Sequence, residues 1–314
     1  MVIPVEICHA AYARPVLEHL SKYFAQTTFL TFRKKLFADL SEDTLLLLGE
    51  GKGNRQGPAQ FRWSDLASAG ALDEDAVAIW GIPREFLCPA VRRGRSLAGV
   101  LFTKQDWRDG LKNGESGYLL RILRNQQLPA GLRNYLAHGE ARGVSKTFKC
   151  RTRSPWFSVP HVYKPDAFLT YMSGHVPRLV ANAAGAVAPN SLHILRLHQG
   201  VSMSSNGLAA VWQTSLSALS AEIEGHALGG GMLKLEPTEA ENVLIACPDF
   251  VASKFADLAT EMNALGRKNS ASSLEDLGNV EILQNGLGLT SRDCEILSTA
   301  AAQLRSRRMG RSAA

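Results

Sequence analysis

The sequence predicts a mixed α/β (α+β) protein. Three observations lead to this prediction. Strand-type and helix-type patterns of hydrophobic residues alternate over residues 1–50, and both patterns occur in the middle of the chain. The last part of the chain has the hydrophobic periodicity of helices. We expect a partial α/β segment at 1–60, a mixed α/β domain at 61–250, and a helical C-terminal segment at 251–314 that ends in a basic tail. A chain of 314 residues, 45% of them hydrophobic, can form two domains with sizeable cores.

The opening segment has the pattern of one side of an α/β sheet. Strand-type runs occupy 2–7 (VIPVEI), 27–32 (TTFLTF) and 44–48 (TLLLL), and a helix is expected to begin at Pro15. This order of strand, helix, strand and strand supplies too few strands to close an independent α/β domain. We therefore expect an incomplete sheet with an exposed flank.

A glycine-rich stretch, GEGKGN at 49–54, follows the third expected strand. A dinucleotide-type loop, G-x-G-x-x-G, would require glycine where Asn54 stands. No helix is expected after it, because Pro58 and the strand-like run FRW come next. The stretch is therefore interpreted as a hairpin turn or a surface loop, and no residue of this chain is expected to bind a cofactor.

Beyond residue 60 the expected elements mix both types. They are, in chain order, a short amphipathic helix at 118–124, a strand at 191–198, a helix at 207–225 and a short strand after the glycines of 229–231. Thr238 and Glu241 have the spacing of a capping box for the next helix. The basic tail, 305–314, is expected to be frayed.

Cations and aromatic rings alternate in KTFKCRTRSPWFSVPHVYKPD, at 146–166. The whole chain has a net charge of +6. Residues 141–180 contain seven Lys and Arg and a single acidic residue, Asp166. Such a field attracts a polyanion, while exposed rings can stack on bases. The alternatives are a solvated basic face and aromatic residues that anchor a loop in the core. The candidate nucleic-acid contacts are Lys146, Lys149, Arg151, Arg153, Trp156, Tyr163 and Lys164.

Several other classes of site lack their motifs. The sequence contains no GxxxxGK[ST], GxSxG, HExxH or EF-hand loop. His193 and His198 are five residues apart on an expected strand and so face opposite sides, which argues against a metal site. The five Cys form no CxxC pair, and no apolar run is long enough for a membrane span. We expect a protein of the reducing cytoplasm with no metal ion, no membrane contact and no catalytic residue of its own.

Several runs resemble the carboxy-terminal part of the adenine-N6 DNA methyltransferases of bacterial restriction-modification systems. The region 2–53 is similar to the late strands of their Rossmann-like methyltransferase sheet. The runs that resemble their target-recognition domain are CRTRSPWFSVP, LVANAAGAVAPNSLHIL and EIEGHALGGGMLKLEPTEA. None of these runs is an active-site motif of the family.

The resemblance implies that the chain binds DNA and that the complete enzyme transfers a methyl group to adenine. In the family, a glycine-rich loop binds S-adenosylmethionine, and an Asn/Asp-Pro-Pro-aromatic tetrapeptide holds the flipped adenine; this sequence has no Pro-Pro pair. Phe37 matches the position of a ring that stacks on the flipped base, or else closes a hairpin core. Lys234 is a further candidate DNA contact, and Glu236 would accept from a cytosine amino group or pair with Lys234.

The implied function is DNA recognition for a site-specific adenine methyltransferase. S-adenosylmethionine would serve the complete enzyme, and a catalytic segment or subunit would supply the missing motifs. This chain alone is expected to be inactive. The alternative is a truncated, non-catalytic DNA-binding or scaffold protein that docks on a partner subunit.

Overall fold

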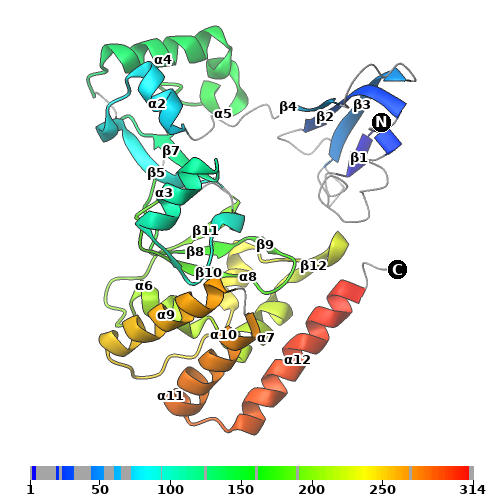
Figure 1. Ribbon diagram of the computed structural model, residues 1–314, viewed down its shortest axis with the longest axis vertical. Helices are drawn as coiled ribbons and strands as arrows, with labels where there is room; N and C mark the ends of the chain where they lie inside the picture. The colour runs from blue at the N-terminus through cyan, green and yellow to red at the C-terminus, as the bar shows by residue number, and fades with distance from the viewer. Residues whose placement is uncertain are drawn as a thin grey trace. The chain divides into compact units, whose positions relative to one another are not determined.

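The chain divides into two compact units, Met1–Ala69 and Gly70–Ser312, which are described separately (Figure 1). The computed structural model describes residues 2–4, 19–20, 23–31, 44–52, 60–64, 72–92, 94–123, 126–159, 162–188, 191–268 and 271–310. Short sheets and many helices occur along the described chain, which confirms the mixed α/β class.

The first unit contains a four-stranded sheet with the order β1-β3-β2-β4. Its strands are β1 (Val2–Pro4), β2 (Phe24–Thr31), β3 (Thr44–Lys52) and β4 (Gln60–Ser64). β3 pairs antiparallel with β1 and β2, whereas β4 runs parallel to β2. The expected strands are confirmed, and β4 adds a strand beyond the boundary placed at residue 60. The helix expected from Pro15 lies mostly outside the described residues, as does Phe37.

The glycine-rich stretch is extended backbone where the structure describes it. Gly49, Glu50 and Lys52 belong to β3 and pair with Thr27, Gln26 and Phe24 of β2. The expectation of a turn or loop at these positions was wrong. The pairing of β3 with β2 continues beyond the apolar residues of β3 as far as Lys52. Residues 53 and 54 lie outside the described residues.

The second unit begins with a small layer of helices on a two-stranded sheet. Its elements are α2 (Glu74–Trp80), β5 (Leu87–Val91), α3 (Lys104–Lys112), β7 (Ser116–Leu120) and α4 (Ala130–Ala141), with 3-10 turns at Arg84–Phe86 and Gly94–Ser96. Phe86, Leu132 and Leu136 lie in its buried core. The helix expected at 118–124 is wrong: Tyr118–Leu120 pair with β5, and a short apolar run does not distinguish the two structures.

A four-stranded sheet with the order β11-β8-β10-β6 forms the centre of the second unit. Its strands are β6 (Leu101–Phe102), β8 (Ala167–Thr170), β10 (Leu179–Asn182) and β11 (Leu192–Leu195). Successive side chains point to opposite faces. Leu169 and Leu179 therefore join the core beneath the C-terminal helices, while Phe168 and Val180 join the core on the other face.

A second, smaller sheet has the order β12-β13-β9, with antiparallel neighbours. It contains β9 (Met172–Ser173), β12 (His226–Leu228) and β13 (Met232–Lys234), and a 3-10 turn, Gly229–Gly231, joins the last two. The strand expected after the glycines is confirmed. The expected capping box is wrong: α8 (Pro237–Asn242) has Glu236 at its N-cap and uses Glu239, because Pro237 occupies the first helical position.

The helix expected at 207–225 is two helices, α6 (Ser205–Val211) and α7 (Ser215–Glu224). Thr214 caps α7 by accepting from Ser217 N at 3.3 Å, and Asn279 accepts from Ser215 N at 2.9 Å. The break is therefore stabilised partly by a residue far away in the sequence, which periodicity cannot show.

The C-terminal region is helical, as expected. It comprises α9 (Ala252–Arg267), α10 (Ala271–Gly278), a π-helical turn (Asn279–Gln284), α11 (Asn285–Leu287) and α12 (Ser291–Gly310). The helix α12, red in Figure 1, packs against α7. The expectation of a frayed tail is wrong for residues 305–310, because these residues are helical and Arg308 is buried.

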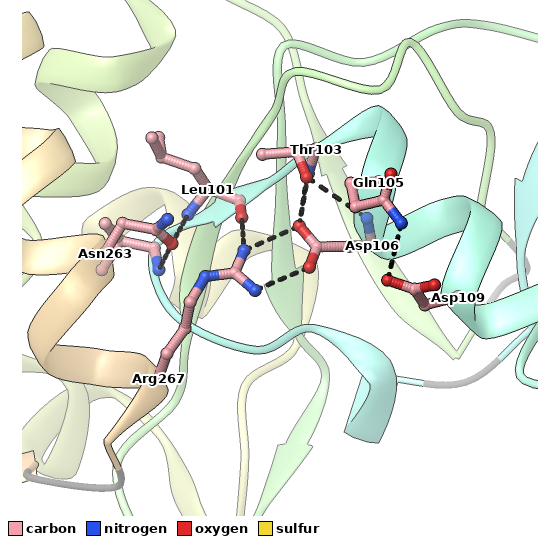
Figure 2. Close-up of polar contacts among 8 residues, drawn as sticks. Leu101, Thr103, Gln105, Asp106, Asp109, Asn263 and Arg267 are labelled. Carbon is pink, nitrogen blue, oxygen red and sulfur yellow. Dashed lines mark hydrogen bonds and ion pairs between the residues drawn. The ribbon is translucent and has the colours of Figure 1, made fainter.

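Two side chains of α9 cover the edge strand β6 (Figure 2). Asn263 Oδ1 accepts hydrogen bonds from Val100 N at 3.2 Å and Leu101 N at 3.1 Å. Arg267 donates to Leu101 O at 3.2 Å and to both carboxylate oxygens of Asp106, each at 2.7 Å. Side chains thus take the place of a neighbouring strand and satisfy backbone groups that would otherwise form an open edge.

Asp106 also caps α3, because it accepts from Thr103 N and Thr103 Oγ1, both at 2.7 Å. Burial, the largest single influence, raises the pKa of Asp106, but the bonds from Arg267 and Thr103 together leave that pKa below its ordinary value. The carboxylate therefore stays ionised at neutral pH and links α9 to the start of α3.

Candidate nucleic-acid interface

The predicted basic segment follows α4 in the second unit. It begins with a 3-10 turn, Val144–Lys146, and continues through the short helix α5 (Phe148–Arg151). Gly143 adopts a φ of 77°, a left-handed conformation that suits glycine and reverses the chain after α4. Lys146, Lys149 and Arg151 are exposed and Arg153 is half-buried, so one compact turn presents four cations.

Carboxylates are scarce around these cations in the sequence. No Asp or Glu occurs between 141 and 165, and the nearest preceding acid is Glu140. Glu140 accepts a hydrogen bond from the indole nitrogen of Trp156 at 2.7 Å. Over residues 141–165 the sequence therefore carries only positive formal charges, which suits a polyanion.

Trp156 is part of the packing beneath the basic segment. Its ring packs against the core that contains Leu132 and Leu136. A Cβ placed on Gly139 of α4 would lie 3.1 Å from the ring, so α4 approaches the indole closely. Phe157 meets the same ring edge to face, with centroids 5.7 Å apart. These contacts favour the anchor alternative for Trp156 over stacking on a base.

Tyr163 follows the basic segment in the sequence and has a cationic neighbour of its own, Arg196. Its side chain is 41% exposed, and the guanidinium of Arg196 lies 4.6 Å from the ring centroid. Lys164 is exposed beside it, and Asp166 accepts from Leu197 N at 2.8 Å. Arg196 thus places one cation over an exposed ring, and Lys164 is a second exposed cation at the next position in the chain.

Lys234, at the end of β13, lies in a polar network. Its Nζ is 2.6 Å from Glu236 and 5.2 Å from the ring centroid of Tyr171, whose hydroxyl donates to Glu236 at 3.0 Å. The hydrogen bond with Glu236 raises the pKa of Lys234, and the same bond lowers the pKa of Glu236. Of the two roles considered for Glu236, pairing with Lys234 is the one present here.

The predicted contacts thus form three groups: the basic segment with Trp156, the Tyr163 group and the Lys234 network. Arg196, Tyr171 and Arg308 were not predicted from the sequence. The spacing of Lys234 and Glu236 was a visible signal, but the participation of Tyr171 depends on the pairing of β9 with β13.

Other kinds of site find no support in the described part of the chain. Among those residues, no three His, Cys, Asp or Glu side chains lie together as metal ligands. His193 instead places Nε2 2.7 Å from Leu235 O. No described helix is both long and apolar enough to cross a bilayer.

Comparison with known proteins identifies a family. Residues 71–283 match the family described as the C-terminal domain of Type II methyltransferase M.Eco57I. A curated relative, Type II methyltransferase M.AccI of Acinetobacter calcoaceticus, is 24% identical over 162 residues. That match covers 51% of this chain and 30% of the relative, so the chain matches less than a third of that protein.

Proposed function

The chain belongs to the family of the Type II methyltransferase M.Eco57I C-terminal domain, and from that premise we propose that it recognises DNA for a site-specific adenine-N6 methyltransferase. The family match makes it a C-terminal part of a restriction-modification DNA methyltransferase. The observation that supports the DNA-binding role is the basic segment, a compact turn of four cations, three of them exposed, in a stretch without a carboxylate.

Each of the three groups is proposed to make a different contact with DNA. Lys146, Lys149, Arg151 and Arg153 hold the phosphate backbone, because ammonium and guanidinium groups bind phosphates without regard to sequence. Tyr163 and Lys164 add a ring and a charge on a second surface, and Lys234 adds a third contact. Trp156 supports the basic segment from beneath.

Methyl transfer requires groups that this sequence does not contain. S-adenosylmethionine would supply the methyl group in the complete enzyme. The described part of the glycine-rich stretch does not fit that cofactor, since Gly49–Lys52 are paired strand and not a turn leading into a helix. The sequence also has no Pro-Pro pair. We therefore propose that another segment or subunit supplies the cofactor site and catalytic residues, while Phe37 remains a candidate ring for the flipped adenine.

This chain alone should not bind S-adenosylmethionine. Of the glycines that come nearest to a cofactor loop, Gly49 and Gly51 lie in β3, which pairs with β2, and Gly53 lies outside the described residues. Isothermal titration of the purified chain with S-adenosylmethionine should give no heat of binding. Micromolar binding would show that a cofactor site exists in this chain and would contradict the proposed division of roles.

Changing Lys149, Arg151 and Arg153 together to Ala should weaken binding to duplex DNA on every sequence. Each lost phosphate contact should flatten the plot of log K against log salt concentration by about one unit. Fluorescence anisotropy with duplex DNA at several salt concentrations measures this slope. A matched control removes three exposed cations elsewhere in the same unit, Lys104, Arg108 and Lys268.

The two triple variants separate the candidate functions. DNA recognition by the basic segment requires a flatter slope for the first variant and an unchanged slope for the control. Equal slopes for both variants would mean that DNA binds elsewhere. If the unchanged chain binds no duplex at low salt, the non-catalytic scaffold function, with a partner protein as its ligand, becomes the better proposal.

A further inference from the structure

The guanidinium of Arg308 is buried and links α12 to α7. The Arg308 side chain is 4% exposed. Its Nε and Nη2 donate to the two carboxylate oxygens of Glu222 at 2.9 and 2.8 Å. Arg305, one turn earlier, approaches the same carboxylate at 3.4 Å, so two cations share one acid. A buried charge is costly unless it is paired, and Glu222 provides that pairing.

Arg308 also holds two loops by their carbonyl groups. Its Nη2 donates to His175 O at 3.0 Å, and its Nη1 donates to Gly231 O and, at 3.5 Å, to Gly174 O. Gly174 and His175 directly follow β9, and Gly231 directly precedes β13. One side chain therefore fixes the loops at the neighbouring ends of two paired strands.

These loops set the position of Lys234. In the sheet, Lys234 pairs with Met172 of β9 and with His226 of β12. The strands β13 and β9 have three and two residues, so few ladder bonds define their register. Register in such short strands depends on the turns that join them. The Gly229–Gly231 turn joins β12 to β13, and the loop after β9 begins beside the start of β13; Arg308 binds both.

We propose that Arg308 is a positioning residue, which holds β13 in the place from which Lys234 contacts a DNA phosphate. This inference rests on the proposed function, in which Lys234 binds DNA. In this proposal α12 supports the DNA-binding surface through Arg308, although no residue of α12 has to touch DNA. The path runs from the guanidinium through the carbonyl of Gly231 and along β13 to Lys234.

Arginine suits this role for a geometric reason. Its planar guanidinium presents five N–H donors, and at Arg308 they reach one carboxylate and three carbonyl groups at once. A lysine would keep a positive charge near Glu222, but a single ammonium cannot reproduce this fork. Arg308→Lys thus separates the loss of the carbonyl contacts from the loss of charge.

The test is a double-mutant cycle on the salt slope of DNA binding, measured well below the melting temperature of each variant. Lys234→Met should lower the slope by about one unit, as expected for one lost phosphate contact. Arg308→Lys should lower the slope by a large part of that unit. The double variant should equal Lys234→Met alone, because both changes remove the same contact. Arg307→Lys, on the exposed neighbour, is the matched control and should leave the slope unchanged.

Hydrogen exchange of the protein without DNA gives a second readout. In Arg308→Lys, amides of Gly229–Gly231 and 173–176 should exchange faster, while amides of the central sheet should not. An unchanged slope for Arg308→Lys, or additive losses in the double variant, would overturn the positioning role and leave the Lys234 contact intact. An unchanged slope for Lys234→Met would overturn the Lys234 contact and this inference together, while the basic segment would still be judged by its own triple variant.

Discussion

Replacing Trp156 by Ala should lower the free energy of unfolding by about 3 kcal/mol, the low end of the range for large aromatic residues in cores, because this side chain is only half-buried. The change leaves a gap against Gly139 and Phe157 and removes the hydrogen bond to Glu140. Thermal and chemical denaturation of the two proteins measures the difference. If Trp156 were instead exposed to solvent and served only to stack on a base, its replacement by Ala would leave the free energy of unfolding nearly unchanged.

Trp156→Phe is the matched control for this prediction. It keeps an aromatic ring against α4 but loses the indole N–H that donates to Glu140. We expect a loss of about 1 kcal/mol, the usual net contribution of one hydrogen bond. Equal stabilities for the Ala and Phe variants would show that the ring contributes little packing, and the role of Trp156 as an anchor would then be wrong.

Elements whose pattern is local were predictable from the sequence. The run TLLLL predicted β3, and the glycines of 229–231 predicted a turn before β13, because these signals require no distant partner. The failures involve tertiary partners. Tyr118–Leu120 form a strand only because β5 pairs with them. The helix expected at 207–225 breaks at Thr214, where Asn279 accepts from the backbone of Ser215.

The same distinction holds for the candidate site. A run of cations needs no partner to be recognised, so Lys146, Lys149, Arg151 and Arg153 could be nominated from the sequence. The basic tail was expected to be frayed, because nothing near Arg308 in the sequence indicates its partner Glu222, which lies on α7. Lys234 could be nominated, but the ring of Tyr171 beside it depends on the antiparallel pairing of β9 with β13.

The C-terminal helices bind the strands of the second unit at two places. On one side, Arg308 of α12 holds the loops around β9 and β13. On the other, Asn263 and Arg267 of α9 cover the edge of the central sheet at Leu101 (Figure 2). Changes in these helices should therefore alter the proposed DNA contacts even where no helix residue touches DNA.

Replacing Asn263 by Ala should lower the free energy of unfolding by about 2–3 kcal/mol. Val100 N and Leu101 N would lose their acceptor, and an unsatisfied buried donor costs about 1–3 kcal/mol. Asn263→Asp is the control, because a carboxylate oxygen still accepts both bonds; its stability should stay within about 1 kcal/mol of the unchanged protein. Chemical denaturation measures both variants, and equal losses for Ala and Asp would contradict this account of the edge.

Gly99 gives an independent check on the same contact. It has a φ of 68°, and a Cβ added there would lie 2.3 Å from Asn263 Oδ1. Gly99→Ala therefore introduces left-handed strain, of about 1–2 kcal/mol, and also pushes the amide away from its two donors. In the Asn263→Ala background the clash with Oδ1 is gone, while the strain and a 3.2 Å approach to the backbone oxygen of residue 263 remain. The second change should therefore cost less there than in the unchanged protein. Strictly additive losses would mean that Asn263 does not hold the edge of β6, and that α9 is joined to the sheet mainly by Arg267 and apolar packing.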